Sequence, residues 1–341
     1  MILLGKPLPA TSSYKYLGHT IDSDGGYRSH LRSVLQKVRH TAYLIGRVTS
    51  RSSLPSPSIV CRIVRAVLLP QMTYAFSLVP VSVSVLRKMT QIAAAPLRKA
   101  LGLMKHSSAA RVLWEFGLYD LRTLHCKAVM DALLRARRCA KSNLTLAAYL
   151  AHDFDSYAPA RVPEHCTPFP VTISRTLALL DLPAPPNDKA MLKSALDKLA
   201  VAQWQRAPIS DGAKSIKPGL KSPAYLKFDH KPAVCVRARV RLSSELSFKR
   251  LHLFKKRPSA GCDFCLDPMG DIRHLLLHCP RFAHARSQCT FALHNDLRTP
   301  LPFNFDVLRG ILPDDIRKSD NKRCLKITAA FLSSVSSVHF L

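Results

Sequence analysis

Three cysteines and one histidine between positions 262 and 279 constrain the fold more than any other feature of this chain. They form a C-x2-C-x8-H-x4-C pattern made of Cys262, Cys265, His274 and Cys279. Two thiolates on a tight turn, followed by an imidazole and a third thiolate on a helix, can close a tetrahedral zinc site. The protein fills all four positions of such a site, so the metal would fold the segment and leave no position for a substrate. The spacing therefore predicts a structural zinc ion.

A second imidazole offers a rival ligand. His278 lies one helical turn after His274 and immediately precedes Cys279. If His278 and the adjacent Cys279 bound the same ion, the chain between them would have to bend awkwardly. We therefore predict that His274 is the ligand and that His278 lies at the surface or beside the ligands.

Net charge is the second constraint. The chain has 51 Lys+Arg against 22 Asp+Glu, a formal net charge of +29, while its hydrophobic fraction of 47% is ordinary for a folded protein. A protein this basic repels itself unless it meets a polyanion, and phosphate backbones are the most common one. The composition favours a folded nucleic-acid-binding protein, with a basic protein that lacks such a partner as the alternative.

The number of cysteines indicates the cellular compartment, and the longest uncharged run indicates whether the chain contacts a membrane. Ten cysteines are too few for a disulfide scaffold, and the N-terminus lacks a signal peptide, so we expect a nuclear or cytoplasmic protein that is not secreted. Residues 66–86 carry no charge and are long enough to span a bilayer. Because Pro70 and Pro80 interrupt them, we predict two buried helical pieces and no membrane partner.

Hydrophobic spacing predicts a mainly α fold in three parts. Residues 1–150 carry 22 Lys/Arg against five Asp/Glu; they begin with an extended segment at 1–26, and a helical module follows. Residues 151–232 form a proline-rich linker with one or two helices, at about 174–180 and 188–205, and a basic loop at 214–231. Residues 233–341 hold a basic helix at about 232–256, the cysteine cluster and C-terminal helices. The other expected helices cover about 27–51, 58–69, 82–101, 109–116, 121–140, 281–295, 306–312 and 320–338.

The sequence contains no recognisable catalytic constellation. The adjacent pair Asp314–Asp315 follows a proline and is typical of a turn, and no third carboxylate in a strand context joins it for two-metal chemistry. Glycine-rich phosphate loops and the G-x-S-x-G motif are absent from the sequence. We therefore predict no catalytic residues and a binding protein.

Three segments together resemble the C-terminal part of a LINE-type, non-LTR retrotransposon reverse transcriptase. Residues 14–22, YKYLGHTID, look like the primer-grip segment that leads into the thumb. Residues 69–74, LPQMTY, and residues 86–103 resemble the thumb helices that cradle a template–primer duplex. The cysteine pattern with Pro280-Arg281-Phe282 resembles the zinc knuckle near the end of these polyproteins.

The resemblance implies RNA and DNA as partners, namely the element RNA and the target-site DNA, together with the remainder of a polyprotein. The family consists of RNA-directed DNA polymerases, but its catalytic aspartates lie in a palm upstream of where this chain begins. Asp314–Asp315 has the wrong neighbours for the palm loop, so we expect that this chain does not polymerise DNA alone.

The resemblance and the placement of the basic residues together suggest which residues bind nucleic acid. The thumb surface is expected to hold duplex backbone through Arg32, Arg39, Lys88 and Arg98. The basic arm before the knuckle is expected to engage single strands or the target site through Arg237, Arg239, Arg241, Lys249, Arg250, Lys255 and Lys256. Aromatic residues among these cations are candidates to stack on bases: Tyr14, Tyr16, Phe228, Phe248, Phe254 and Phe264.

Two alternatives stay open from sequence alone. In the first, the zinc knuckle scaffolds a protein-binding surface of a cellular interaction protein. In the second, the chain is a non-functional remnant of an element.

Overall fold

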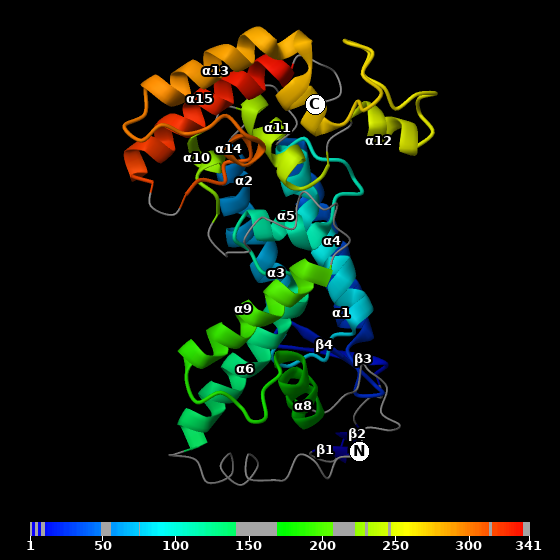
Figure 1. Ribbon diagram of the computed structural model, residues 1–341. Coiled ribbons are helices and arrows are strands. Elements are labelled where there is room, and N and C mark those ends of the chain that lie inside the picture. The colour runs from blue at the N-terminus through cyan, green and yellow to red at the C-terminus, as the bar shows by residue number, and fades with distance from the viewer. Residues whose placement is uncertain are drawn as a thin grey trace. The chain divides into compact units, whose positions relative to one another are not determined.

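The computed structural model is mostly helical, as the sequence predicts (Figure 1). It describes residues 2–3, 6–7, 11–48, 56–74, 76–140, 169–206, 222–228, 231–244, 247–313 and 316–336. The chain folds into two compact units that interleave along the sequence. Unit 1 comprises Met1–Leu44, Ile63–Ala93 and Tyr119–Gln203, and unit 2 comprises Ile45–Arg62, Ala94–Leu118 and Trp204–Leu341. The predicted parts, by contrast, follow one another along the chain, with boundaries at 150 and 232.

The extended N-terminal segment forms two short antiparallel hairpins. Strands β1 (Ile2–Leu3) and β2 (Lys6–Pro7) pair first, and β3 (Ser13–Tyr16) then pairs with β4 (His19–Asp22). Leu17 and Gly18 connect β3 to β4 with φ values of 45° and 84°. A two-residue loop with both φ angles positive matches the right-handed twist of the paired strands, and glycine adopts this conformation at little cost.

The helices of the N-terminal half follow the predicted periodicity. They are α1 (Arg28–Val48), α4 (Val83–Ala100), α5 (Ala109–Glu115) and α6 (Leu121–Ala140). Between α1 and α4 lie α2 (Pro57–Ile63), a π-helical turn η1 (Val64–Leu68) and α3 (Leu69–Thr73). Pro70 was expected to break the helix, but the helical backbone continues past it from Pro57 to Thr73. The π-helical turn η1 immediately before Pro70, in which the Leu69 N–H donates to the Val64 carbonyl, interrupts the regular i→i−4 bonding that a proline inside a helix would break.

The break expected at Pro80 is present, because α4 begins only at Val83. Among the described helices, none combines the length and apolar character that a membrane span requires.

A helical core closes unit 1. Helices α8 (Phe169–Leu180) and α9 (Lys189–Arg206) follow α6 in the described chain, and α8 begins earlier than the predicted helix at 174–180. Val129 and Leu133 of α6 pack with Ile173 of α8 and Leu196 of α9 in one buried cluster. The predicted linker at 151–168 and most of the basic loop, residues 207–221, lie outside the described residues.

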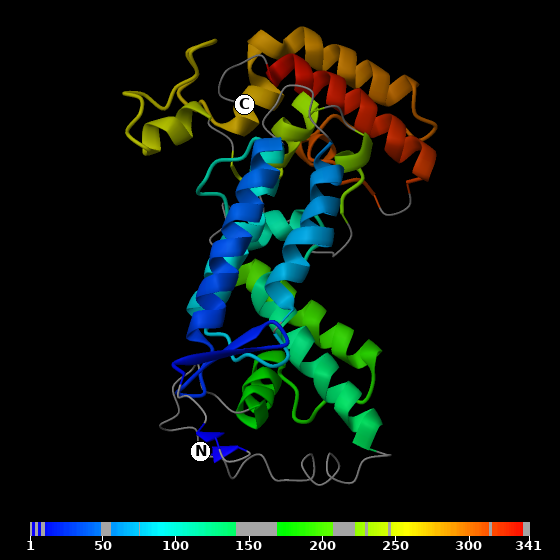
Figure 2. The same ribbon diagram turned by 180° about the vertical axis from the view of Figure 1, so that it is seen from behind.

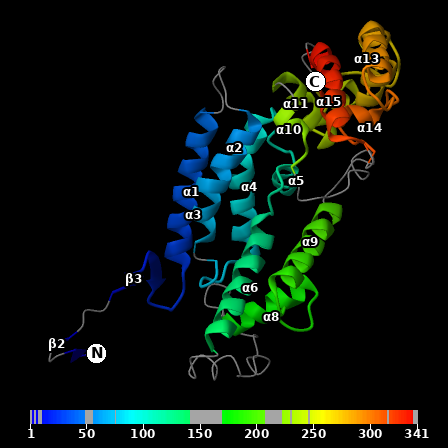
Figure 3. The ribbon, with the colours of Figure 1, turned by 90° about the vertical axis from the view of Figure 1, so that its left-hand side faces the viewer.

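Unit 2 is built around a layer of three helices. Helix α11 (Lys231–Arg241) packs against α15 (Lys318–Ser336), and α15 packs against α13 (Ala283–Asn295), as Figures 2 and 3 show from two sides. The smaller elements are α10 (Tyr225–Phe228), α12 (Phe248–Leu253), the π-helical turn η5 (His274–His278), the 3-10 turn η6 (Pro280–Phe282) and α14 (Phe305–Leu308).

The continuous basic helix predicted at 232–256 is wrong. Helix α11 ends at Arg241, and α12 begins only after Ser247. Ser243 has a left-handed φ of 50°, and the Ser244 N–H donates to the Arg239 carbonyl at 2.7 Å, which closes the end of the helix. Serines favour helix ends over helix interiors because their side chains compete for backbone hydrogen bonds. The predicted arm is therefore two elements.

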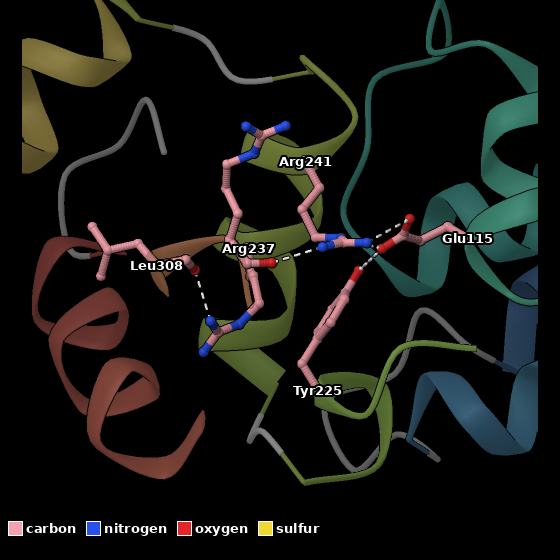
Figure 4. Close-up of polar contacts among 6 residues, drawn as sticks. Glu115, Tyr225, Arg237, Arg241 and Leu308 are labelled. Carbon is pink, nitrogen blue, oxygen red and sulfur yellow. Dashed lines mark hydrogen bonds and ion pairs between the residues drawn. The ribbon is translucent and has the colours of Figure 1, made fainter. Parts of the chain in front are cut away.

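Buried charges cross-link unit 2 (Figure 4). Arg241 Nε lies 2.5 Å from Glu115 Oε1, and its Nη1 donates to the Arg309 carbonyl at 2.8 Å. The Tyr225 hydroxyl donates to Glu115 at 2.7 Å, and Arg237 Nη1 donates to the Leu308 carbonyl at 2.6 Å. Burial alone would lower the pKa of Arg241, but Glu115 raises it above its ordinary value. Arg241 therefore stays charged, and its ion pair with Glu115 joins α11 to α5. The hydrogen bonds of Tyr225 and Leu308 add α10 and α14 to the same network.

Candidate metal centre

The four residues of the sequence pattern meet in the folded chain. Their ligand atoms all lie within 4.8 Å of one another. The sulfurs of Cys262 and Cys279 are 3.8 Å apart, and the Cys265 sulfur lies 3.2 Å from Nε2 of His274. Two sulfurs that each bind a tetrahedral ion at about 2.3 Å are separated by about 3.8 Å. The cluster can therefore hold a metal ion with little rearrangement.

A tight turn presents the first two cysteines. The Leu266 N–H donates to the Cys262 carbonyl at 2.9 Å, and the Cys262 N–H donates to the Asp267 carbonyl at 2.8 Å. Leu266 closes the turn with a left-handed φ of 60°. This backbone arrangement places Cys262 and Cys265 side by side.

A short helical turn presents the other two ligands. The Asp271 side chain accepts the His274 N–H at 2.8 Å and so caps the start of this turn. The Cys279 N–H donates to the His274 carbonyl at 2.8 Å, and Pro280 follows at once. His274 and Cys279 are thereby held at the two ends of one π-helical turn.

Asp267 orients the histidine ligand. Its Oδ2 lies 3.4 Å from Nδ1 of His274, which leaves Nε2 directed at the cluster. A carboxylate behind a metal-binding imidazole fixes its tautomer and increases its basicity. Asp267 was not predicted as part of the site, although a carboxylate two residues after a C-x2-C turn is a signal that could have indicated it. His278, the rival, is exposed and is not part of the cluster, so the structure brings together the predicted set.

Two of the thiols at this centre, those of Cys262 and Cys279, have raised pKa values. Burial raises the pKa of Cys262, and it raises the pKa of Cys279 to about 12. Only a thiolate is a good metal ligand, so binding of a cation must release protons from these sulfurs. The donor set therefore fits a cation that binds thiolate strongly.

Gly270 permits the close approach of the two halves of the centre. A β-carbon on Gly270 would lie 2.7 Å from the Ala260 carbonyl oxygen and 2.9 Å from the backbone of Gly261. These neighbours are backbone atoms, which cannot swing away. The Gly270 N–H also donates to the Ala260 carbonyl at 3.0 Å.

We expect Gly270→Ala to lower the free energy of unfolding of unit 2 by about 1–3 kcal/mol, as overpacking does. Gly46→Ala is the control, because its β-carbon would meet only a flexible Lys99 side chain at 3.8 Å within α1. A helical glycine replaced by alanine gains about 0.5–1 kcal/mol. Urea denaturation compares the two variants, and equal stability of both would contradict the packing argument.

The cationic arm is tied to this centre. The Lys249 N–H donates to the Gly270 carbonyl at 3.1 Å, and Arg257 forms an ion pair with Asp263. The Phe264 ring packs against that of Phe248, with ring centroids 5.6 Å apart. Phe248 is 1% exposed, so the prediction that it stacks on bases is wrong. The other aromatic candidates are exposed: Tyr14, Tyr16, Phe228, Phe254 and Phe264.

Three predicted nucleic-acid contacts are wrong because the side chains are buried. Arg98, Arg237 and Arg241 are 8%, 0% and 7% exposed. Arg98 donates from Nε and Nη2 to the Ser107 carbonyl, at 2.9 and 2.7 Å. Arg237 and Arg241 belong to the buried network of Figure 4. These arginines bond within the fold and have almost no exposed surface.

The remaining candidates are accessible to different degrees. Arg239 is half-buried and donates to the Gly102 carbonyl at 2.9 Å. Lys249 and Arg250 are half-buried, and the exposed candidates are Arg32, Arg39, Lys88, Lys255 and Lys256. The accessible charge of the arm thus lies on and after α12.

Comparisons with protein-family models, curated proteins and solved structures find no match to this chain.

Proposed function

We propose that Cys262, Cys265, His274 and Cys279 bind a structural zinc ion. Three thiolates and one imidazole suit zinc among the common cellular metals, because the soft sulfur ligands disfavour magnesium and calcium. Four protein ligands complete a tetrahedron, so the ion would hold the knuckle together and would not present a reactive position. Asp267 supports this assignment because it orients His274 from outside the ligand set.

We further propose that the chain binds RNA and DNA as part of a non-LTR retrotransposon reverse transcriptase. The net charge of +29 supports a polyanionic partner. Exposed Arg32, Arg39 and Lys88 supply cations on unit 1, and Lys255 and Lys256 supply them on unit 2. The described segments that resemble a primer grip and a knuckle adopt a hairpin and a closed Cys/His cluster, which is compatible with this origin.

One observation carries the proposal of nucleic-acid binding. The cationic segment on and after α12 is fastened to the metal centre by the Lys249–Gly270 hydrogen bond and by the ion pair between Arg257 and Asp263. A closed metal site thus holds exposed Lys255 and Lys256 in a fixed place, beside the exposed ring of Phe254. Ordered cations with an adjacent aromatic ring are the elements of a single-strand binding surface.

We expect Lys255→Gln/Lys256→Gln to weaken binding of a single-stranded RNA. Loss of two phosphate contacts should lower the slope of log affinity against log salt by about 1.4, since each contact on a single strand contributes about 0.7. Fluorescence anisotropy with a labelled RNA, at salt concentrations between about 50 and 200 mM, measures the affinity and its salt dependence. Over this range the affinity of a nucleic-acid-binding protein can fall by about 10³–10⁵-fold, so the change in slope is measurable.

Arg137→Gln/Arg138→Gln is the matched control, because it removes the same charge from exposed positions at the end of α6 in unit 1. The proposal fails if the unaltered chain binds RNA without salt dependence or does not bind it. Equal slopes for the two double variants would remove Lys255 and Lys256 from the interface.

The second candidate function is protein recognition by the knuckle. Apolar side chains around it face solvent, with Leu266 88%, Leu253 70% and Met269 50% exposed. On this view, the Lys255→Gln/Lys256→Gln variant keeps its protein partner while Leu266→Ser loses it. A pull-down with both variants separates the two functions. Such a test leaves Arg237 and Arg241 intact, because their removal would disrupt unit 2 itself.

A further inference from the structure

A cavity of about 870 Å³ lies beside the metal centre, within unit 2. Its walls come from residues 104–111, 240–244, 247–254 and 271–273, together with Phe305. Pockets that enclose an organic ligand have volumes of about 300–1,000 Å³. The cavity therefore has room for a group much larger than a single inorganic ion.

The charged groups in the wall are mainly cationic. Arg111, Lys249, Arg250 and Arg273 line the cavity, while Asp271 is the one carboxylate among the lining residues. Asp271 Oδ1 already accepts a hydrogen bond from the His274 N–H at 2.8 Å, so part of the hydrogen-bonding capacity of this carboxylate is used inside the protein. The wall thus favours an anionic ligand.

Aromatic and apolar side chains lie next to these cations. The guanidinium of Arg250 lies 5.8 Å from the ring centroid of Phe254, and that of Arg273 lies 5.1 Å from the ring centroid of Phe305. Phe254 is 49% exposed, which leaves part of its ring free to contact a ligand. Cations beside an accessible aromatic ring suit a ligand that has a phosphate and a flat base.

The wall is held in place by internal bonds. Arg250 Nη1 donates to the Ser243 carbonyl, and the side chains of Ser107 and Ser244 are hydrogen bonded to each other. The Lys249 N–H bonds to Gly270, and Arg273 immediately precedes the ligand His274. A metal ion in the knuckle would therefore fix the positions of both Lys249 and Arg273, which preorganises the cavity.

We propose that this cavity binds one nucleotide of a single-stranded nucleic acid, with the phosphate held by Lys249 and Arg273 and the base against Phe254. The inference rests on the proposed nucleic-acid binding and names a subsite for it. Free nucleotides carry the same chemistry, so the test must separate a nucleotide within a strand from a free one.

The test uses the full chain with one equivalent of zinc and a fluorescein-labelled dodecamer of uridine. Lys249→Gln/Arg273→Gln is compared with the charge-matched Arg137→Gln/Arg138→Gln. Loss of two charge-assisted contacts is expected to weaken binding about tenfold or more, against less than about threefold for the control. Unchanged tryptophan fluorescence and metal content verify that the variants are folded. Uridine monophosphate, uridine and inorganic phosphate are titrated in parallel, and uridine monophosphate is expected to compete best among them.

The position of the bound base is checked separately. A dodecamer with 4-thiouridine at one position is expected to cross-link to the peptide that contains Phe254, and the cross-link should decrease in the Lys249→Gln/Arg273→Gln variant.

Each outcome decides a different point. If the dodecamer binds with steep salt dependence but the two double variants weaken it equally, the cavity is not the subsite and the proposed function survives. If uridine monophosphate binds and the dodecamer does not, the cavity is a site for free nucleotides and the proposed function is wrong. If neither probe binds, both proposals are overturned.

Discussion

His274→Asn is expected to abolish stoichiometric zinc binding and to unfold the knuckle of unit 2. The substitution removes the one nitrogen ligand, whose Nε2 lies 3.2 Å from the Cys265 sulfur. In zinc-finger peptides the apparent free energy of metal binding is about 10–16 kcal/mol, so the ion can supply most of the stability of such a small segment. Metal analysis of the purified protein gives the zinc content, and hydrogen exchange of residues 248–282 reports their folding.

His278→Asn is the matched control for this prediction. The same chemical change is made at an exposed histidine in the same π-helical turn, outside the ligand cluster. This variant should retain one zinc ion and the exchange protection of the unaltered protein. If His278→Asn loses the metal and His274→Asn keeps it, the ligand assignment is wrong.

Glu115→Gln is expected to lower the free energy of unfolding of unit 2 by about 3–5 kcal/mol. The carboxylate of Glu115 is the partner of buried Arg241 and also accepts the Tyr225 hydroxyl. Burial raises the pKa of Tyr225 well above its ordinary value, so this hydroxyl stays protonated and cannot replace the lost negative charge. The variant leaves a buried guanidinium without its counter-charge, which is far more costly than loss of an exposed ion pair.

The two tryptophans of the chain provide the measurement. Trp114 and Trp204 are both buried in unit 2, with ring centroids 6.1 Å apart, so their fluorescence in a urea titration follows this unit. Asp263→Asn is the control in the same unit, since it breaks the Arg257–Asp263 pair, where the aspartate is 56% exposed. A pair at such a surface contributes about 0–1 kcal/mol. A similar small effect of Glu115→Gln would show that the buried pair does not stabilise the unit.

A double-mutant cycle isolates the pair itself. Arg241→Met combined with Glu115→Gln removes both charges, so the double variant should be less destabilised than the sum of the single variants. Strict additivity would mean that the two side chains do not interact in solution.

The sequence predicts most clearly what depends on local spacing. Helices α1 and α6 follow the three- and four-residue spacing of their apolar side chains. The Cys/His cluster was predictable because its four residues lie within one short segment, so their spacing carries the geometry. The helix end at Ser243 was missed, although Ser243 and Ser244 interrupt the pattern there, because charged and apolar residues resume directly after them.

Contacts between residues far apart in the sequence explain why buried arginines were predicted as nucleic-acid contacts. Glu115 precedes its partner Arg241 by 126 residues, and nothing near Arg241 in the sequence indicates that a carboxylate will neutralise it. Arg237 likewise bonds to a carbonyl 71 residues away. A run of arginines therefore has the same pattern whether it faces solvent or the core. The cavity beside the knuckle was missed for the same reason, because its walls come from distant stretches.

Unit 2 is built from three separate stretches of the chain, which limits how the protein can be cut into fragments for expression. A recombinant fragment of residues 233–341 would contain the knuckle but would lack Glu115 and Tyr225, the buried partners of Arg241. It would also lack Gly102, whose carbonyl accepts Arg239 at 2.9 Å. Excision at the apparent domain boundary thus removes the partners that Arg239 and Arg241 have in the intact protein. The knuckle keeps its native surroundings only when the stretch from Ala94 to Leu118 is present in the same molecule.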